Sequence, residues 1–400
     1  MNTYIIDAIR TPIGNFGGTL KAVRTDDLAA IPIKELIKRT GINPERIDDV
    51  IIGCANQAGE DNRNIARMAL LLAGLPYSVP GETVNRLCAS GMSSVIHAHR
   101  AICSGDGNIF IAGGVENMTR GPWVISKASR PYGRDSKMYD SSFGWRFINP
   151  KMKDLYGVDG MGHTAENLAE KYNISREDQD KFAYNSQMKA TNAQCKGRLD
   201  EEIISVEIPQ RKKDPIVFKY DEFIKGDTSI EVLGKLRTAF KKEGGSVTAG
   251  NASGLNDGAA AMLLASEDGV KENNLTPIAE IISSAVVGVE PRIMGIGPVK
   301  ASNKALQKAG LSMEDMDIIE LNEAFAVQAL SCIREWGLED NDARINPNGG
   351  AIALGHPLGA SGTRIIQTAA IELHKQNKDY ALITMCIGVG QGYATIIKKI

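Results

Sequence analysis

The sequence predicts an α/β protein built from two related halves. Short apolar runs alternate with stretches of helical periodicity at both ends of the chain, a pattern typical of parallel or mixed sheets covered by helices on both faces. The chain also repeats itself: residues 41–48 align with 310–317, 89–91 with 360–362, and Asp106 with Asp379. Its 400 residues are ample for two or three domains with sizeable cores.

Each half is predicted to contain the same order of elements. In the N-terminal half we expect strands over 4–9, 50–53, 83–85 and 109–112, with the last strand ending at Gly113 and Gly114. Helices are expected over 28–40 and 89–103, and Gly41 should end the first because glycine readily adopts a left-handed backbone. The C-terminal half gives helices over 301–308 and 361–374 and strands over 318–321 and 380–385.

The middle of the chain departs from the repeat and is predicted to be an inserted loop or cap domain. It is richer in charged and aromatic residues, and Ser175 carries a capping signal for a helix running to about Lys196. The basic run 211–213 is expected to be solvated surface. The predicted domains are therefore 1–120, with about 254–273 returning to it, 121–253 for the insertion, and 274–400.

The composition limits the classes of partner. A formal net charge of −2 and a pI near 6.3 argue against nucleic acid or an acidic membrane surface. No apolar run approaches the ~20 residues of a membrane span. The N-terminal residues show no signal-peptide pattern, so we expect a cytoplasmic protein.

The six cysteines lack metal-ligand spacing, so no metal is expected. Four of them are most simply small hydrophobes: Cys54, Cys103, Cys195 and Cys332.

Three residues form a candidate catalytic set. Cys88 follows a predicted strand at a strand-to-helix turn, where the helix N-terminus would lower its thiol pKa and its own N–H would stabilise an oxyanion. Cys386 closes the apolar run 380–386, and His356 lies in the glycine-rich stretch 346–362. A thiol nucleophile, an imidazole base and a second thiol for proton transfer suit chemistry on thioesters. The simpler alternative is two buried cysteines and a loop histidine.

Neighbouring residues extend this set. The N–H of Gly388, two residues beyond Cys386, would serve as a second oxyanion donor. Asn322 would fix a water or a carbonyl, whereas Glu323 could equally be a helix-start carboxylate. The remaining histidines lie in helical patterns or polar loops and are interpreted as structural: His97, His99, His163 and His374.

Five motifs occur in the order typical of one family, over residues 84–91, 248–254, 322–325, 355–357 and 386–388. The chain resembles the thiolases (acetyl-CoA C-acyltransferases) along its whole length. The resemblance implies a duplicated thiolase fold, with α/β/α/β/α layers and an inserted loop domain, in a homodimer or homotetramer. It also implies acyl-CoA substrates, with CoA or acetyl-CoA as co-substrate and no tightly bound cofactor.

The resemblance assigns roles residue by residue. Cys88 would be acylated, with His356 drawing its proton, and Cys386 would exchange a proton with the α-carbon of the acetyl unit. Asn322 would hold a water that, with His356, stabilises the enolate oxygen, and the N–H groups of Cys88 and Gly388 would hold the tetrahedral oxyanion. The expected CoA contacts are Ser253, Ala249, Met161, Phe240 and Lys225.

Two alternatives and one narrower substrate remain open at this point. The alternatives are a ketoacyl-synthase-like condensing enzyme, against which Cys386 argues, and a non-catalytic CoA-binding protein. Residues 57–67 and 144–150 resemble 3-oxoadipyl-CoA thiolases, although residues 87–92 depart from the form typical of that subgroup. The candidates for meeting the carboxylate of such a substrate are Arg63, Arg67, Arg86, Arg130, Arg134 and Arg146.

Overall fold

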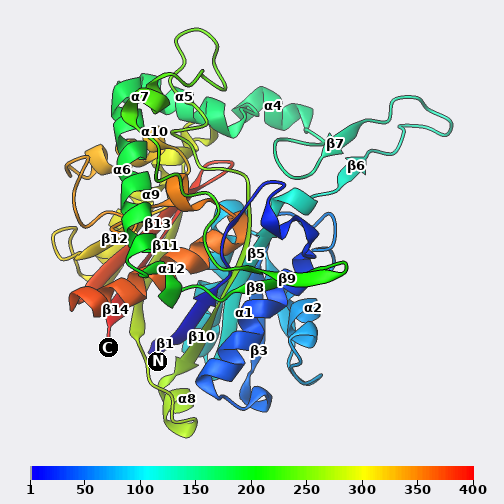
Figure 1. Cartoon of the computed structure of the whole chain (residues 1–400), viewed down its shortest axis with the longest axis vertical. Helices are drawn as coiled ribbons and strands as arrows, with labels where there is room; N and C mark the ends of the chain where they lie inside the picture. Colours follow the sequence, from blue (N-terminus) through cyan, green and yellow to red (C-terminus); the bar gives the residue numbers. More distant parts are fainter. Residues whose placement is uncertain (1) are drawn as a thin grey trace.

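The large sheet of the molecule consists of two halves with the same topology (Figure 1). This computed structural model describes residues 2–400. The N-terminal half has the order β4-β3-β5-β10-β1 and the C-terminal half the order β12-β13-β14-β11. Their strands are β1 (Thr3–Arg10), β3 (Asp49–Gly53), β4 (Gly81–Val84), β5 (Ile109–Asn117) and β10 (Asn256–Ser266), then β11 (Ala279–Gly288), β12 (Ile318–Leu321), β13 (Tyr380–Ile387) and β14 (Gln391–Lys399). Short β2 (Gly14–Asn15) pairs with β10.

The pairing of the strands confirms the duplication. β3 and β5 pair in parallel, and β5–β10 and β10–β1 are antiparallel. The second half repeats this scheme, with β12–β13 parallel and β13–β14 and β14–β11 antiparallel. The halves join where β1 meets β11, at Tyr4 opposite Glu280 and Ile5 opposite Ala279.

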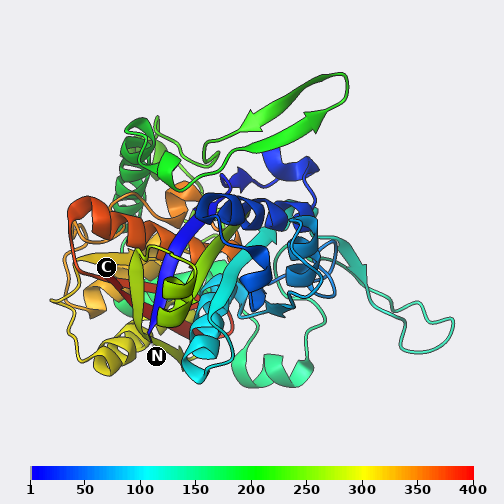
Figure 2. The ribbon, with the colours of Figure 1, turned by 90° about the horizontal axis from the view of Figure 1, so that it is seen from below.

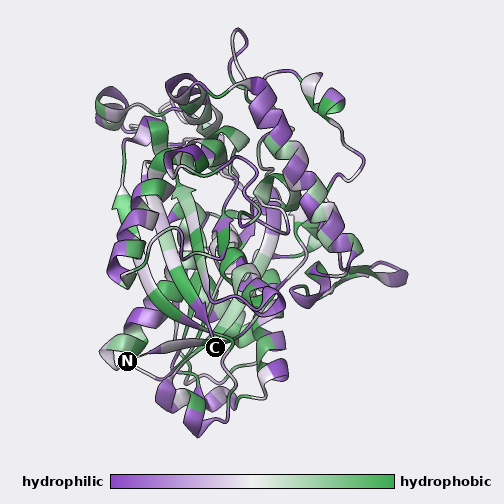
Figure 3. Ribbon diagram, turned by 90° about the vertical axis from the view of Figure 1, so that its left-hand side faces the viewer, coloured by the Kyte–Doolittle hydropathy of each residue, from purple (hydrophilic) through white to green (hydrophobic). Residues whose placement is uncertain are grey.

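Helices cover both faces of each half, so the predicted five layers are confirmed. One core contains Ile33 and Leu70 on the outside of the N-terminal half, and another contains Leu330 on the outside of the C-terminal half. Between them, Met92 and Ile365 pack in a third core with strands of both halves. Figure 3 shows the long apolar stretches of the inner strands. The helices are α1 (Thr25–Thr40) and α2 (Ile65–Leu72) outside one half, α9 (Gly297–Ala309) and α10 (Ala326–Glu335) outside the other, and α3 (Ser90–Ser104) and α12 (Leu358–Gln376) between them; α8 (Glu267–Glu272) and α11 (Ala351–Leu354) are short connections.

Glycines aligned in the repeat allow α3 and α12 to approach closely. A Cβ on Gly91 would lie 2.5 Å from the carbonyl oxygen of Gly359, and one on Gly362 would lie 2.2 Å from the nitrogen of Met92. Because real Cβ atoms do not approach so closely, no larger residue fits at either position without movement. The N-terminal ends of both central helices are therefore brought together, and with them the two halves of the candidate site.

Strand β5 is longer than predicted. It continues through Gly113 and Gly114 to Asn117, so the expectation that it ends at these glycines is wrong. A Cβ on Gly113 would lie 2.4 Å from the oxygen of Ala260, and one on Gly114 would lie 1.8 Å from the oxygen of Gly359. The glycines mark close backbone approach within the sheet and against α12, rather than a strand end.

Most other predicted elements are confirmed within a few residues. Gly41 and Gly310, which align in the repeat, both end helices in the left-handed conformation with φ of 64° and 68°. Ser175 caps α6 (Arg176–Cys195) by accepting a hydrogen bond from the N–H of Asp178. Cys54 and Cys332 are buried as expected. Cys103 and Cys195 are exposed, which does not fit their interpretation as small hydrophobes.

The middle of the chain lies outside both repeated sets. Figures 1 and 2 show two hairpins projecting from the body, β6–β7 and β8–β9. The predicted basic run 211–213 is exposed at the β8–β9 turn. The boundaries 1–120, 121–253 and 274–400 remain a proposal, which the pairing of β10 with β1 and β5 supports. No helix within residues 2–400 has the length and apolarity needed to cross a bilayer. The elements of the insertion are β6 (Trp123–Ile125), β7 (Met138–Asp140), α4 (Pro150–Tyr156), α5 (Met161–Tyr172), α6 (Arg176–Cys195), β8 (Val206–Gln210), β9 (Lys213–Phe218) and α7 (Ile230–Gly234).

Candidate active site

Cys88 lies in a tightly fixed 3-10 turn, Leu87–Ala89, between β4 and α3. The preceding Leu87 has a φ of 47°, a left-handed conformation that is strained for a bulky residue. Its N–H donates to Asn85 Oδ1 at 2.9 Å, and its carbonyl accepts from Ser90 Oγ at 2.7 Å. The turn contacts both α12 and β13. The local backbone thus presents Cys88 to the strand that carries Cys386 and to the helix that begins two residues after His356.

The electrostatics of the Cys88 thiol differ from the sequence expectation. Burial raises the pKa of Cys88 to about 11, and the nearby Glu116 acts in the same direction. The N–H groups of Gly388 and of Cys88 itself face the thiol and partly offset this rise in pKa. The expectation of a lowered thiol pKa is wrong because desolvation outweighs the donors at the helix start. Both expected oxyanion donors nevertheless converge on the sulfur.

Cys386 is the second thiol of the site. It lies near the end of β13, opposite Gly392 of β14, and is 1% exposed. Burial, followed by the proximity of Cys88, raises the pKa of Cys386 well above its usual value. The structure therefore brings the two cysteines from the two halves together, and holds Cys386 as a protonated thiol at neutral pH.

His356 is fixed in a single tautomer by its neighbours. Its backbone N–H donates to Asn256 Oδ1 at 2.9 Å, and its Nδ1 lies 2.6 Å from Ser361 Oγ. Because the Ser361 hydroxyl donates its hydrogen to Pro357 O at 2.9 Å, it must accept from Nδ1–H. Nε2 is then the unprotonated nitrogen. Burial, followed by the Arg364 guanidinium, lowers the pKa of His356 to about 3, so the ring is neutral.

Asn322 faces the free nitrogen of this imidazole. It follows β12, and its N–H donates to Thr384 O at 3.0 Å, which fixes it beside β13. Its Nδ2 lies 3.4 Å from His356 Nε2, and within residues 2–400 its buried Oδ1 has no partner. Glu323 instead accepts from Ser186 Oγ at 2.6 Å and Asn346 Nδ2 at 2.7 Å. Glu323 thus anchors α6, and it also accepts the N–H of Ile352 at 3.3 Å. It is therefore a helix-start carboxylate for α11 rather than for α10, which begins only at Ala326.

Three of the expected CoA contacts form a continuous strip away from Gly388. A Cβ on Gly388 would lie 3.7 Å from Met161 Sδ, at the start of α5. The ring of Phe240 packs edge-on against Phe325 at a centroid separation of 6.3 Å. Ser253 donates its N–H to Ala324 O at 3.0 Å, so the 248–254 loop lies beside the 322–325 segment.

The other two expected CoA contacts, Ala249 and Lys225, are exposed. Ala249 is exposed at the tip of the same loop. Lys225 is also exposed, with Nζ 5.5 Å from the ring centroid of Phe223. Because a Cβ on Gly254 would lie 2.7 Å from that ring, Lys225 lies beside the end of the loop that leads into β10.

Sequence reasoning missed several residues that shape the site. Ser361 sets the tautomer of His356, and Asn256 fixes its backbone, yet only Ser361 had a signal, as part of the glycine-rich stretch. The ring centroid of His163 lies 6.3 Å from that of Phe240, an expected CoA contact, and the interpretation of His163 as structural stays a prediction. No feature of the sequence around Asn256 or His163 distinguished them.

Comparison with known proteins identifies the family. The model of the thiolase N-terminal domain matches residues 3–268 and that of the thiolase C-terminal domain matches 275–399. The chain therefore belongs to the thiolase family and is an acyltransferase. This assignment favours the expected thiolase activity over the ketoacyl-synthase-like and non-catalytic alternatives.

Relatives and solved structures agree with this assignment. The chain is 57% identical over 400 residues to the beta-ketoadipyl-CoA thiolase of Acinetobacter baylyi, covering all of both chains. It is 55% identical over 398 residues to the 3-oxoadipyl-CoA/3-oxo-5,6-dehydrosuberyl-CoA thiolase of Escherichia coli (strain K12), covering 99% of each. The crystal structure of the Bacillus anthracis acetyl-CoA acetyltransferase superposes with a TM-score of 0.92 at 40% identity, covering 100% of this chain and 99% of that one.

Proposed function

We propose that Cys88 is the acyl-carrying nucleophile of a thiolase that cleaves 3-ketoacyl-CoA. Its thiol would attack the C3 carbonyl while His356 Nε2 takes its proton, and the N–H groups of Cys88 and Gly388 would stabilise the oxyanion. The C2–C3 bond then breaks, leaving the acyl group on Cys88 and the electron pair on the acetyl-CoA enolate. Cys386 would protonate C2, releasing acetyl-CoA, and recover its proton from His356.

The second half-reaction returns the enzyme to its starting state. The thiol of CoA attacks the Cys88 thioester, its proton passes to the Cys88 sulfur by way of His356, and acyl-CoA leaves. The same steps in reverse carry out the Claisen condensation. Asn322 Oδ1 would accept from a water that, with His356, stabilises the enolate oxygen. Ser253, Ala249, Met161, Phe240 and Lys225 would contact CoA.

One observation carries this proposal: the turn that holds Cys88 contacts the strand of Cys386, whose thiol is protonated, and the helix that starts two residues after His356, whose imidazole is neutral. Incubation with acetyl-CoA should add one acetyl group to the intact protein by mass spectrometry. Cys88→Ala should abolish the label while leaving the far-UV circular dichroism unchanged. Retention of the label by Cys88→Ala would contradict the assignment of the nucleophile.

We further propose that 3-oxoadipyl-CoA is the preferred substrate. The relatives named for this activity match the chain over its full length at 54–57% identity, which supports the proposal. A carboxylate-recognising site should favour 3-oxoadipyl-CoA over 3-oxohexanoyl-CoA in kcat/KM by ~1.5–3 kcal/mol, the usual range for a hydrogen bond to a charged group. An equal kcat/KM for the two substrates would refute this choice and leave the thiolase activity intact.

A homo-oligomer in the cytoplasm completes the proposed function. The β6–β7 arm exposes large apolar side chains that are unusual on a solvated hairpin, with Trp123 67%, Ile125 66% and Met138 56% exposed. These side chains would be covered by another copy of the chain. Light scattering should give a dimer or tetramer, and replacing Trp123 and Ile125 with serine should lower the mass of the assembly; a monomeric wild-type protein would contradict the proposal.

A further inference from the structure

A dicarboxylic acyl group on Cys88 needs a cationic partner close to the thiol. Under the proposed function, cleavage of 3-oxoadipyl-CoA leaves a succinyl group on Cys88. Its free carboxylate can lie only roughly 6 Å from the sulfur, given carbon–carbon bonds of about 1.5 Å. A carboxylate withdrawn from water is costly unless it is paired. The residue that recognises it must therefore reach the immediate surroundings of the Leu87–Ala89 turn.

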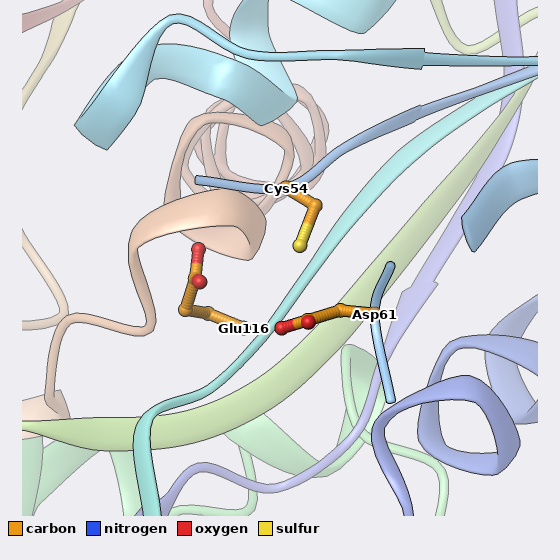
Figure 4. Close-up of side chains that lie close together, drawn as sticks. All are labelled: Cys54, Asp61 and Glu116. Atoms are coloured by element: carbon orange, nitrogen blue, oxygen red, sulfur yellow. The ribbon is translucent and has the colours of Figure 1, made fainter. Parts of the chain in front are cut away.

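The carboxyl groups closest to this turn would repel such a ligand. Figure 4 shows Cys54, Asp61 and Glu116 gathered at the end of β5, with one ligand atom from each lying within 4.8 Å of the others. Glu116 is 1% exposed and accepts the N–H groups of Ala55, Asn56 and Gly359 at 3.0, 2.9 and 2.8 Å. Burial, followed by these carboxyl groups, raises the pKa of the Cys54 thiol well above its usual value. Burial also raises the pKa of Glu116 to about 7 and raises the pKa of Asp61, so this site disfavours negative charge and a further carboxylate here requires a compensating cation.

Four of the six candidate arginines either donate hydrogen bonds to other groups or are exposed to solvent. Arg67 donates to the carbonyl oxygens of Val79 and Tyr77. Arg86 donates to Ser93 Oγ and Gln391 Oε1. The other two, which are exposed in the connection between β6 and β7, are Arg130 and Arg134.

Arg146 has the required position, whereas Arg63 is exposed. Arg146 is half-buried and donates Nη1 to Ser141 O at 3.2 Å. Burial raises the pKa of the Asp61 carboxyl, and the nearby Arg146 guanidinium acts in the opposite direction. Arg146 therefore acts as a cation on Asp61, one carboxyl of the cluster that contains Glu116. Its planar guanidinium also suits two parallel hydrogen bonds to a carboxylate.

Hydrogen bonds connect Arg146 to the turn that carries Cys88. Asn85 Oδ1 accepts a hydrogen bond from the N–H of Leu87 at 2.9 Å, and Asn85 Nδ2 donates to Ala55 O at 3.0 Å. The next residue, Asn56, donates Nδ2 to Ser141 Oγ at 3.1 Å, so Ser141 is shared by Asn56 and Arg146. Asn56 is 9% exposed, and its other amide atom has no partner within residues 2–400. Since Ser141 Oγ can donate or accept, rotating the amide would leave an N–H donor for a ligand.

The backbone on both sides of Arg146 is held in place. Trp145 Nε1 donates to Asp159 O at 3.1 Å, and the ring of Phe147 packs on that of Tyr139 with centroids 4.9 Å apart. Phe147 also has a φ of 51°, a strained conformation for a bulky residue. Strain of this kind persists only where surrounding contacts enforce it. The 141–149 segment thus fixes Arg146 between two anchored aromatic residues.

We propose that Arg146 binds the terminal carboxylate of a dicarboxylic acyl chain carried by Cys88, with the Asn56 amide as a second donor. The guanidinium offsets the charge of Asp61 in the free enzyme and receives the substrate carboxylate in the acyl-enzyme. This inference rests on the proposed 3-oxoadipyl-CoA activity and adds the residue that selects the substrate. The ligand class is a short acyl chain ending in a carboxylate.

The test measures a ratio of rates. For each protein, kcat/KM is determined for 3-oxoadipyl-CoA and for 3-oxohexanoyl-CoA, which replaces the carboxylate by a methyl group. Arg146→Met should lower the ratio of the two values by about 10- to 100-fold, the loss expected for a hydrogen bond to a charged group. Arg146→Lys, which keeps the charge but loses the planar fork, should give an intermediate ratio. Arg344→Met is the matched control, because Arg344 is half-buried, pairs with Asp342 and donates to two backbone carbonyls far from the site.

The outcomes separate this inference from the function on which it rests. A wild-type enzyme with no preference for 3-oxoadipyl-CoA overturns both. A wild-type preference that survives Arg146→Met unchanged overturns the assignment of Arg146 and leaves the substrate in place. An equal loss on both substrates also overturns it, because the ratio is then unaffected. A ratio that falls in Arg146→Met, falls less in Arg146→Lys and stays constant in Arg344→Met supports it.

Discussion

Replacing Ser361 with alanine tests the tautomer on which the proposed proton transfers depend. The Ser361 hydroxyl accepts from His356 Nδ1–H at 2.6 Å and donates to Pro357 O at 2.9 Å. Without it, Nδ1–H is a buried donor with no acceptor. The alternative tautomer moves the proton to Nε2, where Asn322 lies 3.4 Å away and its amide oxygen can accept after rotation. The proton would then occupy the nitrogen that must accept one from Cys88.

The size of the effect follows from the cost of the unsatisfied donor. Leaving a buried polar group unpaired costs about 1–3 kcal/mol. Because each 1.36 kcal/mol is a factor of ten, the population of the Nε2-basic tautomer should fall by roughly 5- to 150-fold. Acylation of Cys88 should slow by the same factor if that tautomer is the reactive one.

The assay is single-turnover acetylation of the enzyme by acetyl-CoA, followed by rapid-quench mass spectrometry. Ser331→Ala is the matched control, because Ser331 is also a buried helical serine that donates to the carbonyl four residues earlier, Val327 O at 2.7 Å, but it contacts no histidine. Urea unfolding should show comparable stability losses for the two variants, with slow acylation in Ser361→Ala alone. Normal acylation in Ser361→Ala would refute the tautomer argument.

Three further predictions concern proton transfer, ionisation and packing. Cys386→Ala should still form the acetyl-enzyme yet lose condensation and cleavage by ~10²-fold or more, as expected of a general acid–base; equal losses in both steps would contradict that division of labour. Burial lowers the pKa of His356 to about 3, so the ring should stay neutral above pH 5. Its Cε1–H NMR signal, identified by its loss in a His356→Asn variant, should therefore not shift between pH 5 and 8. A titration midpoint near the ordinary value of about 6.5 would show that the site is hydrated rather than dry. Gly114→Ala should lower the free energy of unfolding in urea by about 1–3 kcal/mol or more, because the new Cβ would lie 1.8 Å from a carbonyl oxygen. Gly234→Ala, at a helix position with open space, is the control and should be neutral or stabilising. Equal stability of the two variants would disprove the close approach.

Local patterns were sufficient for most of the elements and for the choice of Cys88 as the candidate nucleophile. The duplication, the helix-ending glycines Gly41 and Gly310, and the positions of most strands depend on periodicity and turn chemistry, which are encoded over a few residues. The end of β5 was misplaced because Gly113 and Gly114 serve distant contacts, with Ala260 and Gly359. A glycine in the sequence does not show whether it ends a strand or allows another segment of backbone to pack closely against it.

By itself, the sequence determined the duplicated fold and the family, and it singled out the candidate residues Cys88, His356 and Cys386, because each lies in a local motif. Only the tertiary structure decided their protonation. Burial overrides the helix start at Cys88 and raises its thiol pKa, and Ser361 selects the His356 tautomer from within the folded core. Desolvation and buried hydrogen bonds depend on which segments pack together, and packing between two halves of a chain separated by more than two hundred residues cannot be derived from either motif alone.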